Sequence, residues 1–225
     1  MRKHIQPSLI ASILAGIVCG IGCNPMMLPS FVGPDPTVPP ELHALDMPKK
    51  KGPVRVAILV DNGIDTREEF LGVDRQLGEL LTKQMKQMAE ESGDKLEFAN
   101  LKKLYEYKMS HPNWQEDLQG VGKDLKADFV IYLEVHSMTL YERGSRELYR
   151  GRTDISVSLL RVGDEDDIPD KKEYHGVYPQ VRNAIPVDVD LKESEFREQF
   201  MSFVAQRISW YFMKHPTADT YMDDK

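Results

Sequence analysis

The sequence contains little cysteine. Its two cysteines, Cys19 and Cys23, lie four residues apart near the amino terminus, in the stretch GIVCGIGCNP. Two cysteines are too few for a disulfide scaffold, and the rest of the chain has no thiol that could act as a nucleophile. The pair leaves four interpretations open: a disulfide, a metal clamp, a redox pair, or a segment that leaves the chain before it folds. The choice among these interpretations decides where the protein works.

Motifs that mark common enzymes are also missing. The six histidines are isolated, and without HExxH or a histidine pair at metal-ligand spacing we expect no metal and no cofactor. GxSxG is absent. The run from Gly120 to Asp124 is similar to part of a phosphate loop, but it lacks the upstream glycine, a Ser or Thr after Lys123 and a preceding strand. A net charge of −7 and a pI of about 5.4 argue against nucleic acid as a partner.

The amino terminus has the three parts of a secretory signal peptide, which we assign to residues 1–22. A basic start (MRKH) precedes an apolar run from Leu9 to Val18, and small residues then lead to Cys23. The run is shorter than the roughly 20 apolar residues of a membrane-spanning helix. Extension of the run to Ile21 gives a marginal span, which leaves an uncleaved membrane anchor as the alternative.

The end of this segment, Ile21-Gly22-Cys23, resembles a bacterial lipobox, where a signal peptidase cuts before a cysteine that carries lipid. The resemblance implies cleavage between Gly22 and Cys23, and acyl chains such as palmitate on Cys23. The chain departs from the family at Gly20, where leucine is usual. Asn24 stands where inner-membrane lipoproteins have aspartate, which implies anchoring to the outer membrane with the domain in the periplasm. Secretion after a different cleavage, with Cys23 as a spare thiol, is the alternative.

Residues 23–53 are predicted to form a linker behind this cysteine. The segment carries eight of the 14 prolines. Because proline lacks an N–H and favours extended backbone, we expect a semi-rigid tether between a membrane and a folded domain. Three lysines at 49–51 either contact anionic lipid or keep the linker solvated.

The pattern after the linker predicts one α+β domain from 54 to 215, followed by an acidic flexible tail at 216–225. Alternating or continuous apolar runs predict strands, and apolar residues at helical spacing predict helices, the first of them behind a capping box at 66–69. Strands are expected at 54–60, 96–101, 128–135, 148–159 and 173–180, and helices at 70–92, 113–125 and 193–211. The order βαβαβββα indicates a mixed sheet with the helices packed on one face and a carboxy-terminal amphipathic helix.

Three segments of this domain carry a resemblance to a known group. They read VRVAILVDN, LQGVGKDLKADFVIYLEV and DISVSLLRVGD, within roughly residues 54–165. They resemble the small α/β domain shared by TolB amino-terminal domains and by envelope lipoproteins of the curli-secretion and LpoB type. The resemblance implies a domain that binds envelope partners and catalyses no reaction. The chain departs from the group at Val60–Gly63, where Pro-Phe-Glu-Asn is common, and at Glu134, where glycine is usual. Some members build a pore from extended hairpins, but the hairpin at 137–154 is too charged for a lipid-facing band.

Two classes of function therefore remain, each with its own candidate residues. The leading hypothesis is a lipid-anchored envelope protein whose periplasmic domain is a non-catalytic scaffold or activator, with an aromatic contact surface at Tyr141, Tyr149 and Tyr174. The alternative is a small hydrolase or ligand-binding enzyme that uses Asp61 at the carboxyl end of the first strand, although Asp-Asn-Gly is equally good turn chemistry. His136, at the end of the central strand, is interpreted either as a base or as a hydrogen-bonded strand residue.

Overall fold

The computed structural model describes residues 37–42, 52–63, 70–164, 169–181, 183–187 and 191–217. Several predictions from the sequence lie outside these ranges: the signal peptide, the cleavage site at Gly22 and Cys23, the lysine run at 49–51 and the capping box at 66–69.

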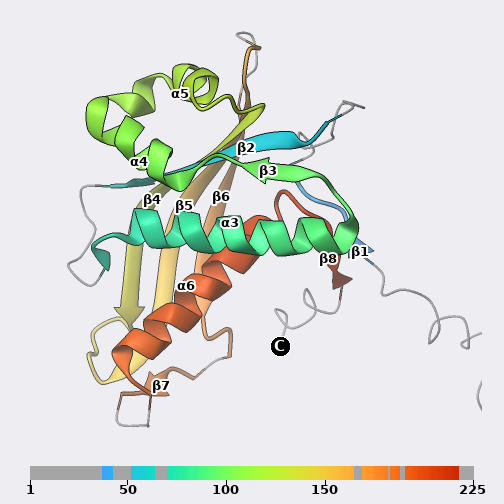
Figure 1. Cartoon of the computed structure of the whole chain (residues 1–225). Coiled ribbons are helices and arrows are strands. Elements are labelled where there is room, and N and C mark those ends of the chain that lie inside the picture. Colours follow the sequence, from blue (N-terminus) through green and yellow to red (C-terminus); the bar gives the residue numbers. More distant parts are fainter. Residues whose placement is uncertain are drawn as a thin grey trace, which may run out of the picture. The chain divides into compact units, whose positions relative to one another are not determined.

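A mixed sheet organises the domain (Figure 1). Its strands are β2 (Val54–Asn62), β3 (Leu96–Phe98), β4 (Phe129–Tyr141), β5 (Leu148–Arg161), β6 (Asp170–Tyr178) and β7 (Ile185–Pro186). The strand order is β3-β2-β4-β5-β6, with β7 paired to β5. Strand β2 is parallel to β3 and to β4, whereas β5 is antiparallel to β4 and β6. The predicted α+β class with a mixed sheet is confirmed.

Helices cover both faces of this sheet, so the prediction of helices on one face was wrong. The helical elements are α3 (Val73–Ser92), α4 (Leu101–Ser110), the 3-10 turn η4 (Trp114–Glu116), α5 (Leu118–Asp124) and α6 (Glu193–Ser209). Successive strand residues point to opposite faces. Val56 and Ile58 accordingly join the core under α3 and α6, while Ala57 and Leu59 join a second core under α4 and α5 (Figure 1).

The direction of the chain across the sheet explains the two helical layers. The connection from β2 through α3 leads to β3 at the edge, and the connection from β3 through α4 and α5 returns past β2 to β4. Parallel crossover connections are almost always right-handed. Two crossovers that travel in opposite directions must therefore place their helices on opposite faces.

Helix α4 was not predicted, because the segment LEFANL at 96–101 was interpreted as one strand. Strand β3 ends at Phe98, and Asn100 caps the new helix: its side-chain oxygen accepts hydrogen bonds from the backbone N–H groups of Lys102 (2.9 Å) and Lys103 (3.3 Å). A side-chain oxygen that binds the first free N–H groups is the usual start of a helix. The predicted helices at 70–92 and 193–211 are confirmed as α3 and α6, although α3 begins only at Val73.

Part of the predicted linker packs on the domain. Residues 37–42, here called the strap, include β1 (Thr37–Val38), which pairs with β8 (His215–Pro216). The backbone N–H of Leu42 donates to the oxygen of Tyr211 (2.8 Å), and Leu42 is only 3% exposed. The strap therefore packs on the domain and contributes Leu42 to its core. Pro216, placed in the tail by the sequence, lies in β8.

Candidate functional site

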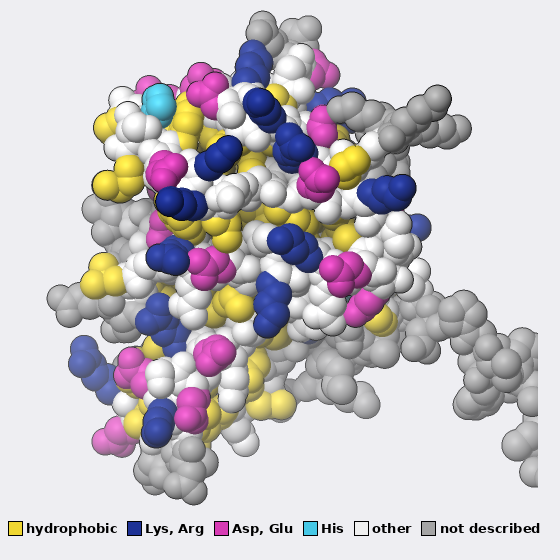
Figure 2. Space-filling model, in the orientation of Figure 1, with side chains coloured by type: hydrophobic (Ala, Val, Ile, Leu, Met, Phe, Trp, Pro, Cys, Tyr) yellow, Lys and Arg dark blue, Asp and Glu magenta, His cyan; other side chains and the backbone are white. Residues whose placement is uncertain are grey.

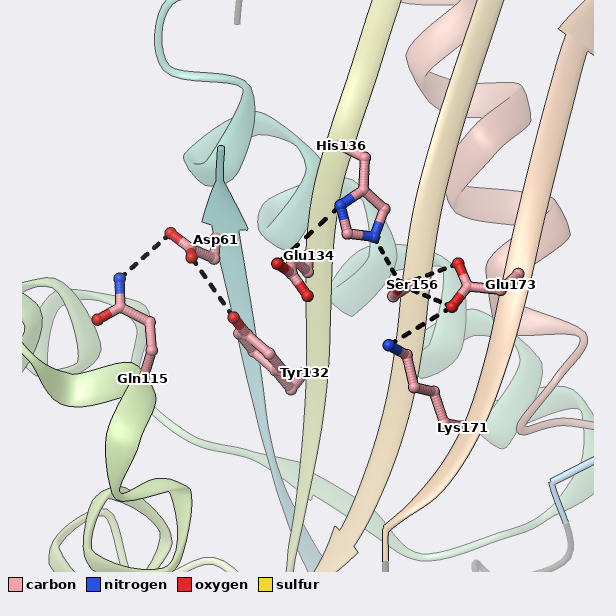
Figure 3. A network of polar contacts seen from close by, with 8 residues as sticks. All are labelled: Asp61, Gln115, Tyr132, Glu134, His136, Ser156, Lys171 and Glu173. Atoms are coloured by element: carbon pink, nitrogen blue, oxygen red, sulfur yellow. Dashed lines mark hydrogen bonds and ion pairs between the residues drawn. The ribbon is translucent and has the colours of Figure 1, made fainter. Parts of the chain in front are cut away.

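A row of polar side chains crosses four strands of the sheet on the face that carries α4 and α5 (Figure 3). We call this set the polar row. It consists of Asp61 from β2, Tyr132, Glu134 and His136 from β4, Ser156 from β5, and Lys171 and Glu173 from β6, with Gln115 from η4 at one end.

Strand register brings these residues together. Asp61 is the partner of Glu134, Glu134 of Ser156, and Ser156 of Glu173. Cross-strand partners lie on the same face with their Cβ atoms about 5 Å apart. Four residues separated by up to 112 positions in the sequence therefore form one line across the sheet.

The polar row begins where the helical cover of this face ends. The second core beneath α4 and α5 contains Leu59, Val130 and Leu160. Leu59 and Val130 each lie two residues from the row residue of their strand, and Leu160 lies four residues from Ser156. Strand β4 shifts register between Val135 and Ser137, so His136 is an additional residue at an irregularity in the ladder. A bulge of this kind redirects a side chain, and it places His136 beside Ser156.

One hydrogen-bonded chain links the histidine to a carboxylate. The Nε2 atom of His136 lies 2.6 Å from the hydroxyl of Ser156, and that hydroxyl donates to both carboxylate oxygens of Glu173 at 2.8 Å. Lys171 adds an ion pair with Glu173 (3.5 Å), and Glu134 lies 4.0 Å from Nδ1 of His136. Each charged group in this set of hydrogen bonds and ion pairs thus contacts a polar or oppositely charged neighbour.

These contacts shift the pKa values of the acids. The hydrogen bond from Ser156 lowers the pKa of Glu173 below its usual value, with a further contribution from Lys171. Next along the same face, hydrogen bonds from Ser137 and His175 lower the pKa of Asp154. Hydrogen bonds to a carboxylate favour its ionised form, so both acids carry negative charge at neutral pH.

The direction of the hydrogen bonds decides what Ser156 can do. A serine hydroxyl has one proton, and the ionised Glu173 can only accept, so the proton of Ser156 points to Glu173. The Nε2 atom of His136 is then the donor toward Ser156, which is the reverse of the arrangement in which histidine takes the proton of a nucleophilic serine. Ser156 is also 2% exposed. The geometry therefore holds charge in place and does not activate a serine nucleophile.

Asp61, the candidate catalytic acid, lies at the far end of the polar row. Its two carboxylate oxygens accept long hydrogen bonds of 3.4 Å from Gln115 and Tyr132. Burial, together with the charges of Asp61 and Glu134, raises the pKa of Tyr132 well above its usual value. Tyr132 therefore stays a neutral donor to Asp61, and the two residues form a hydrogen-bonded pair.

The three tyrosines predicted to form an exposed surface do not form one. Tyr149 (3% exposed) stacks on Phe196 with ring centroids 4.8 Å apart, and Tyr174 (8% exposed) also belongs to the core under α6. Tyr141 is half-buried and donates to Glu193 at 2.6 Å. The prediction was wrong because alternation identifies the two faces of a strand without saying which one a helix covers.

The phosphate-loop interpretation of Gly120 to Asp124 is also excluded by the local structure. These residues lie in α5, and the carboxylate of Asp117 caps the helix by accepting from the N–H of Gly120 at 2.7 Å. Within the described ranges, no three His, Cys, Asp or Glu side chains are arranged to hold a metal ion. No helix in the part of the chain that the structure describes is both long and apolar enough to span a bilayer.

Sequence reasoning singled out Asp61 and His136 but missed the rest of the polar row. Ser156 lies in the strand predicted at 148–159, where polar and apolar residues alternate, and Glu173 lies in the strand predicted at 173–180. The pairing of those strands was not available, because register depends on contacts between distant segments.

Comparisons with known proteins find distant likenesses in structure alone. No protein-family model matches the sequence, and no curated protein matches it. A PelC dodecamer from Paraburkholderia phytofirmans is 8% identical, with a TM-score of 0.43 over 80% of this chain and 99% of that chain. The hypothetical protein CT253 from Chlamydia trachomatis is 13% identical, with a TM-score of 0.40 over 71% and 98%. The lipoprotein GNA1162 from Neisseria meningitidis is 9% identical, with a TM-score of 0.38 over 69% and 98%. Likenesses this distant carry no argument about the function of this chain.

Proposed function

We propose that the chain is a lipid-anchored protein of the bacterial cell envelope, held at the outer membrane through Cys23. The observation that carries the proposal is the stretch Ile21-Gly22-Cys23 behind a basic start and a short apolar run. A proline-rich segment and then a folded domain follow this cysteine, which is the order a tethered domain requires.

We propose further that the domain binds a protein partner in the periplasm and catalyses no reaction. The polar row supports this role, because the carboxylate of Glu173 is ionised and the hydroxyl of Ser156 is engaged with it. Fixed hydrogen-bonding groups on an open strand face suit recognition of polar groups on a partner. The surface proposed for the partner is therefore the polar row, in place of the tyrosines.

The strap limits how far the domain reaches from a membrane. Thr37 follows Cys23 by 14 residues, which span at most about 50 Å when fully extended. A linker that ran to residue 53 without contacting the domain would span about twice that length. The proposed partner must therefore lie close to the membrane that carries the anchor.

Mass spectrometry of the protein purified from bacterial membranes tests the anchor. We expect a mature chain that begins at Cys23 and carries acyl chains, and a Cys23→Ser variant that takes up no labelled palmitate. An unmodified amino terminus at any other residue rejects the anchor and leaves the domain's role to be judged separately.

Site-specific photo-crosslinking in intact cells tests the role of the polar row. A photoreactive residue at Lys171 should give a defined adduct with an envelope protein, and one at the exposed Lys83 on α3 should not. Loss of the Lys171 adduct in a Glu134→Lys variant ties the partner to the row. Equal adducts from both positions contradict the proposed surface.

A further inference from the structure

An apolar groove of 840 Å³ lies between α4 and the amino-terminal part of α3. Figure 2 shows hydrophobic side chains in a band between charged side chains on this side of the molecule. On α4, the lining residues Leu101, Tyr105 and Met109 follow one another at intervals of four. Residues four apart are neighbours on a helix surface, so they form one stripe. Met109 is 85% exposed at the end of this stripe.

Charged residues of both signs flank the groove. On α4, Lys102 pairs with Glu106 at 3.8 Å, and on α3, Arg75 pairs with Glu79 at 2.9 Å. All four side chains line the groove. The α4 wall thus offers one cation and one anion, four residues apart, and the α3 wall offers Arg75 and Glu79 together with Asp74, which pairs with Lys108.

We propose that a second copy of this chain occupies the groove, with the α4 helices of the two copies antiparallel. A two-fold axis between Leu104 and Tyr105 brings Met109 of each copy to within about one residue, or roughly 1.5 Å along the helix, of the position opposite Leu101 of the other. The same axis brings Lys102 of each copy equally close to the position opposite Glu106 of the other, so the contact contains two Lys102–Glu106 pairs.

The occupant is a second copy because the patch is complementary to itself. A contact around a two-fold axis uses the same surface on both subunits, so that surface must carry both the protruding and the receiving groups. Here Met109 protrudes at the end of the stripe whose other end, Leu101, is half-buried. The charge order, cation then anion along α4, matches its own antiparallel image.

Analytical ultracentrifugation of the full chain in detergent tests the proposal. We expect a reversible monomer–dimer equilibrium that depends on protein concentration. Met109→Glu places a charge in the apolar contact and should raise the dissociation constant roughly ten- to a hundredfold. The matched control is Val181→Glu, which adds the same charge at a residue that is 61% exposed and does not line the groove.

A charge exchange tests the antiparallel register. Lys102→Glu and Glu106→Lys alone each put like charges across the contact and should weaken the dimer, whereas the double variant should restore it. The thermal midpoint and circular dichroism spectrum of each variant, measured on dilute monomer, separate a loss of association from a loss of folding.

Three outcomes overturn the proposal. The first is a chain that remains monomeric up to about 100 µM, where an interface with a dissociation constant of about 10 µM is mostly associated; this result leaves the groove to a different partner. The second is an association that Met109→Glu and Val181→Glu change equally. The third is a double charge variant that is no stronger a dimer than the single variants.

Discussion

The ammonium group of Lys108 lies 2.8 Å from the backbone oxygen of Val60. Strand β3 pairs with β2 from Val54 to Val56, and among the residues that the structure describes no strand lies beside this edge of β2 beyond that point. Lys108, from α4, closes that edge and also binds Asp74 of α3 at 3.1 Å. One side chain therefore joins the two helical layers at the edge of the sheet.

Replacement of this lysine should destabilise the domain. Lys108 is 15% exposed, and Lys108→Met leaves the Val60 oxygen and the Asp74 carboxylate without their donor. Loss of a donor to partly buried acceptors costs about 1–3 kcal/mol. Urea unfolding measures the change, and Lys103→Met on the exposed side of α4 is the control. Equal effects of the two substitutions contradict the role of Lys108.

The strap should contribute to stability, although it precedes the predicted domain. Leu42→Ala removes a buried side chain and should lower the free energy of unfolding by about 2–4 kcal/mol. Thr37→Ala, at an exposed strap residue, should change it by less than about 0.5 kcal/mol. Thermal unfolding of the full chain decides the matter: an unchanged midpoint for Leu42→Ala means that the strap does not pack in solution.

The polar row and its neighbour Asp154 should give the domain an acid-sensitive component. The pKa values of Glu173 and Asp154 are lowered in the folded protein. Their contribution is therefore complete above the pKa of the unfolded chain, about 4, and is lost as pH falls through the lower folded values. We expect the thermal midpoint to fall between about pH 5 and pH 2. Both side chains are about half exposed to solvent, so solvent screening keeps the effect small.

Glu173→Gln and Asp154→Asn identify the groups responsible. Each substitution removes one carboxylate. Each should therefore reduce the fall of the thermal midpoint between about pH 5 and pH 2, and should lower the midpoint slightly at pH 7. Glu147→Gln, at an exposed residue of the β4–β5 hairpin, serves as the control. A curve for both variants parallel to that of the unmodified chain shows that other groups titrate.

Substitution of Tyr149 and Tyr141 tests whether these tyrosines pack in the core or form a contact surface. Tyr149→Ala removes a ring stacked on Phe196 and should cost about 3–5 kcal/mol, as for other buried aromatic residues. Tyr141→Ala should cost less, about 1–2 kcal/mol, because that ring is half-buried and loses one hydrogen bond to Glu193. Chemical denaturation measures both. Small, equal losses favour the exposed surface that the sequence predicted.

Much of the fold could be read from local patterns. The run from Val54 to Val60 and the helical spacing from Val73 to Met88 predict β2 and α3, because a continuous apolar run indicates a strand buried on both faces and apolar residues at helical spacing indicate a helix with one buried face. Helix α4 was missed because its first residue, Leu101, was included in the strand predicted at 96–101. The cap at Asn100 was the signal that could have separated the two elements.

The candidate site was harder to predict. Asp61 could be picked out as a carboxylate at a strand end, and His136 as a polar residue after an apolar strand. Their relation to Ser156 and Glu173 depends on the pairing of β5 with β4 and β6 and on the bulge at His136. None of these features has a local signature.

The sequence alone determined the types of the main elements and their order, because hydrophobic periodicity and turn residues act over a few neighbouring positions. It also supplied the whole basis for the anchor proposed at Cys23, which rests on a contiguous stretch. Only the tertiary structure decided that helices cover both faces, that the strap packs on the domain, and that Tyr149 is core while Ser156 joins the polar row. Strand register and crossover direction set these relationships, and both arise from contacts between residues far apart in the chain.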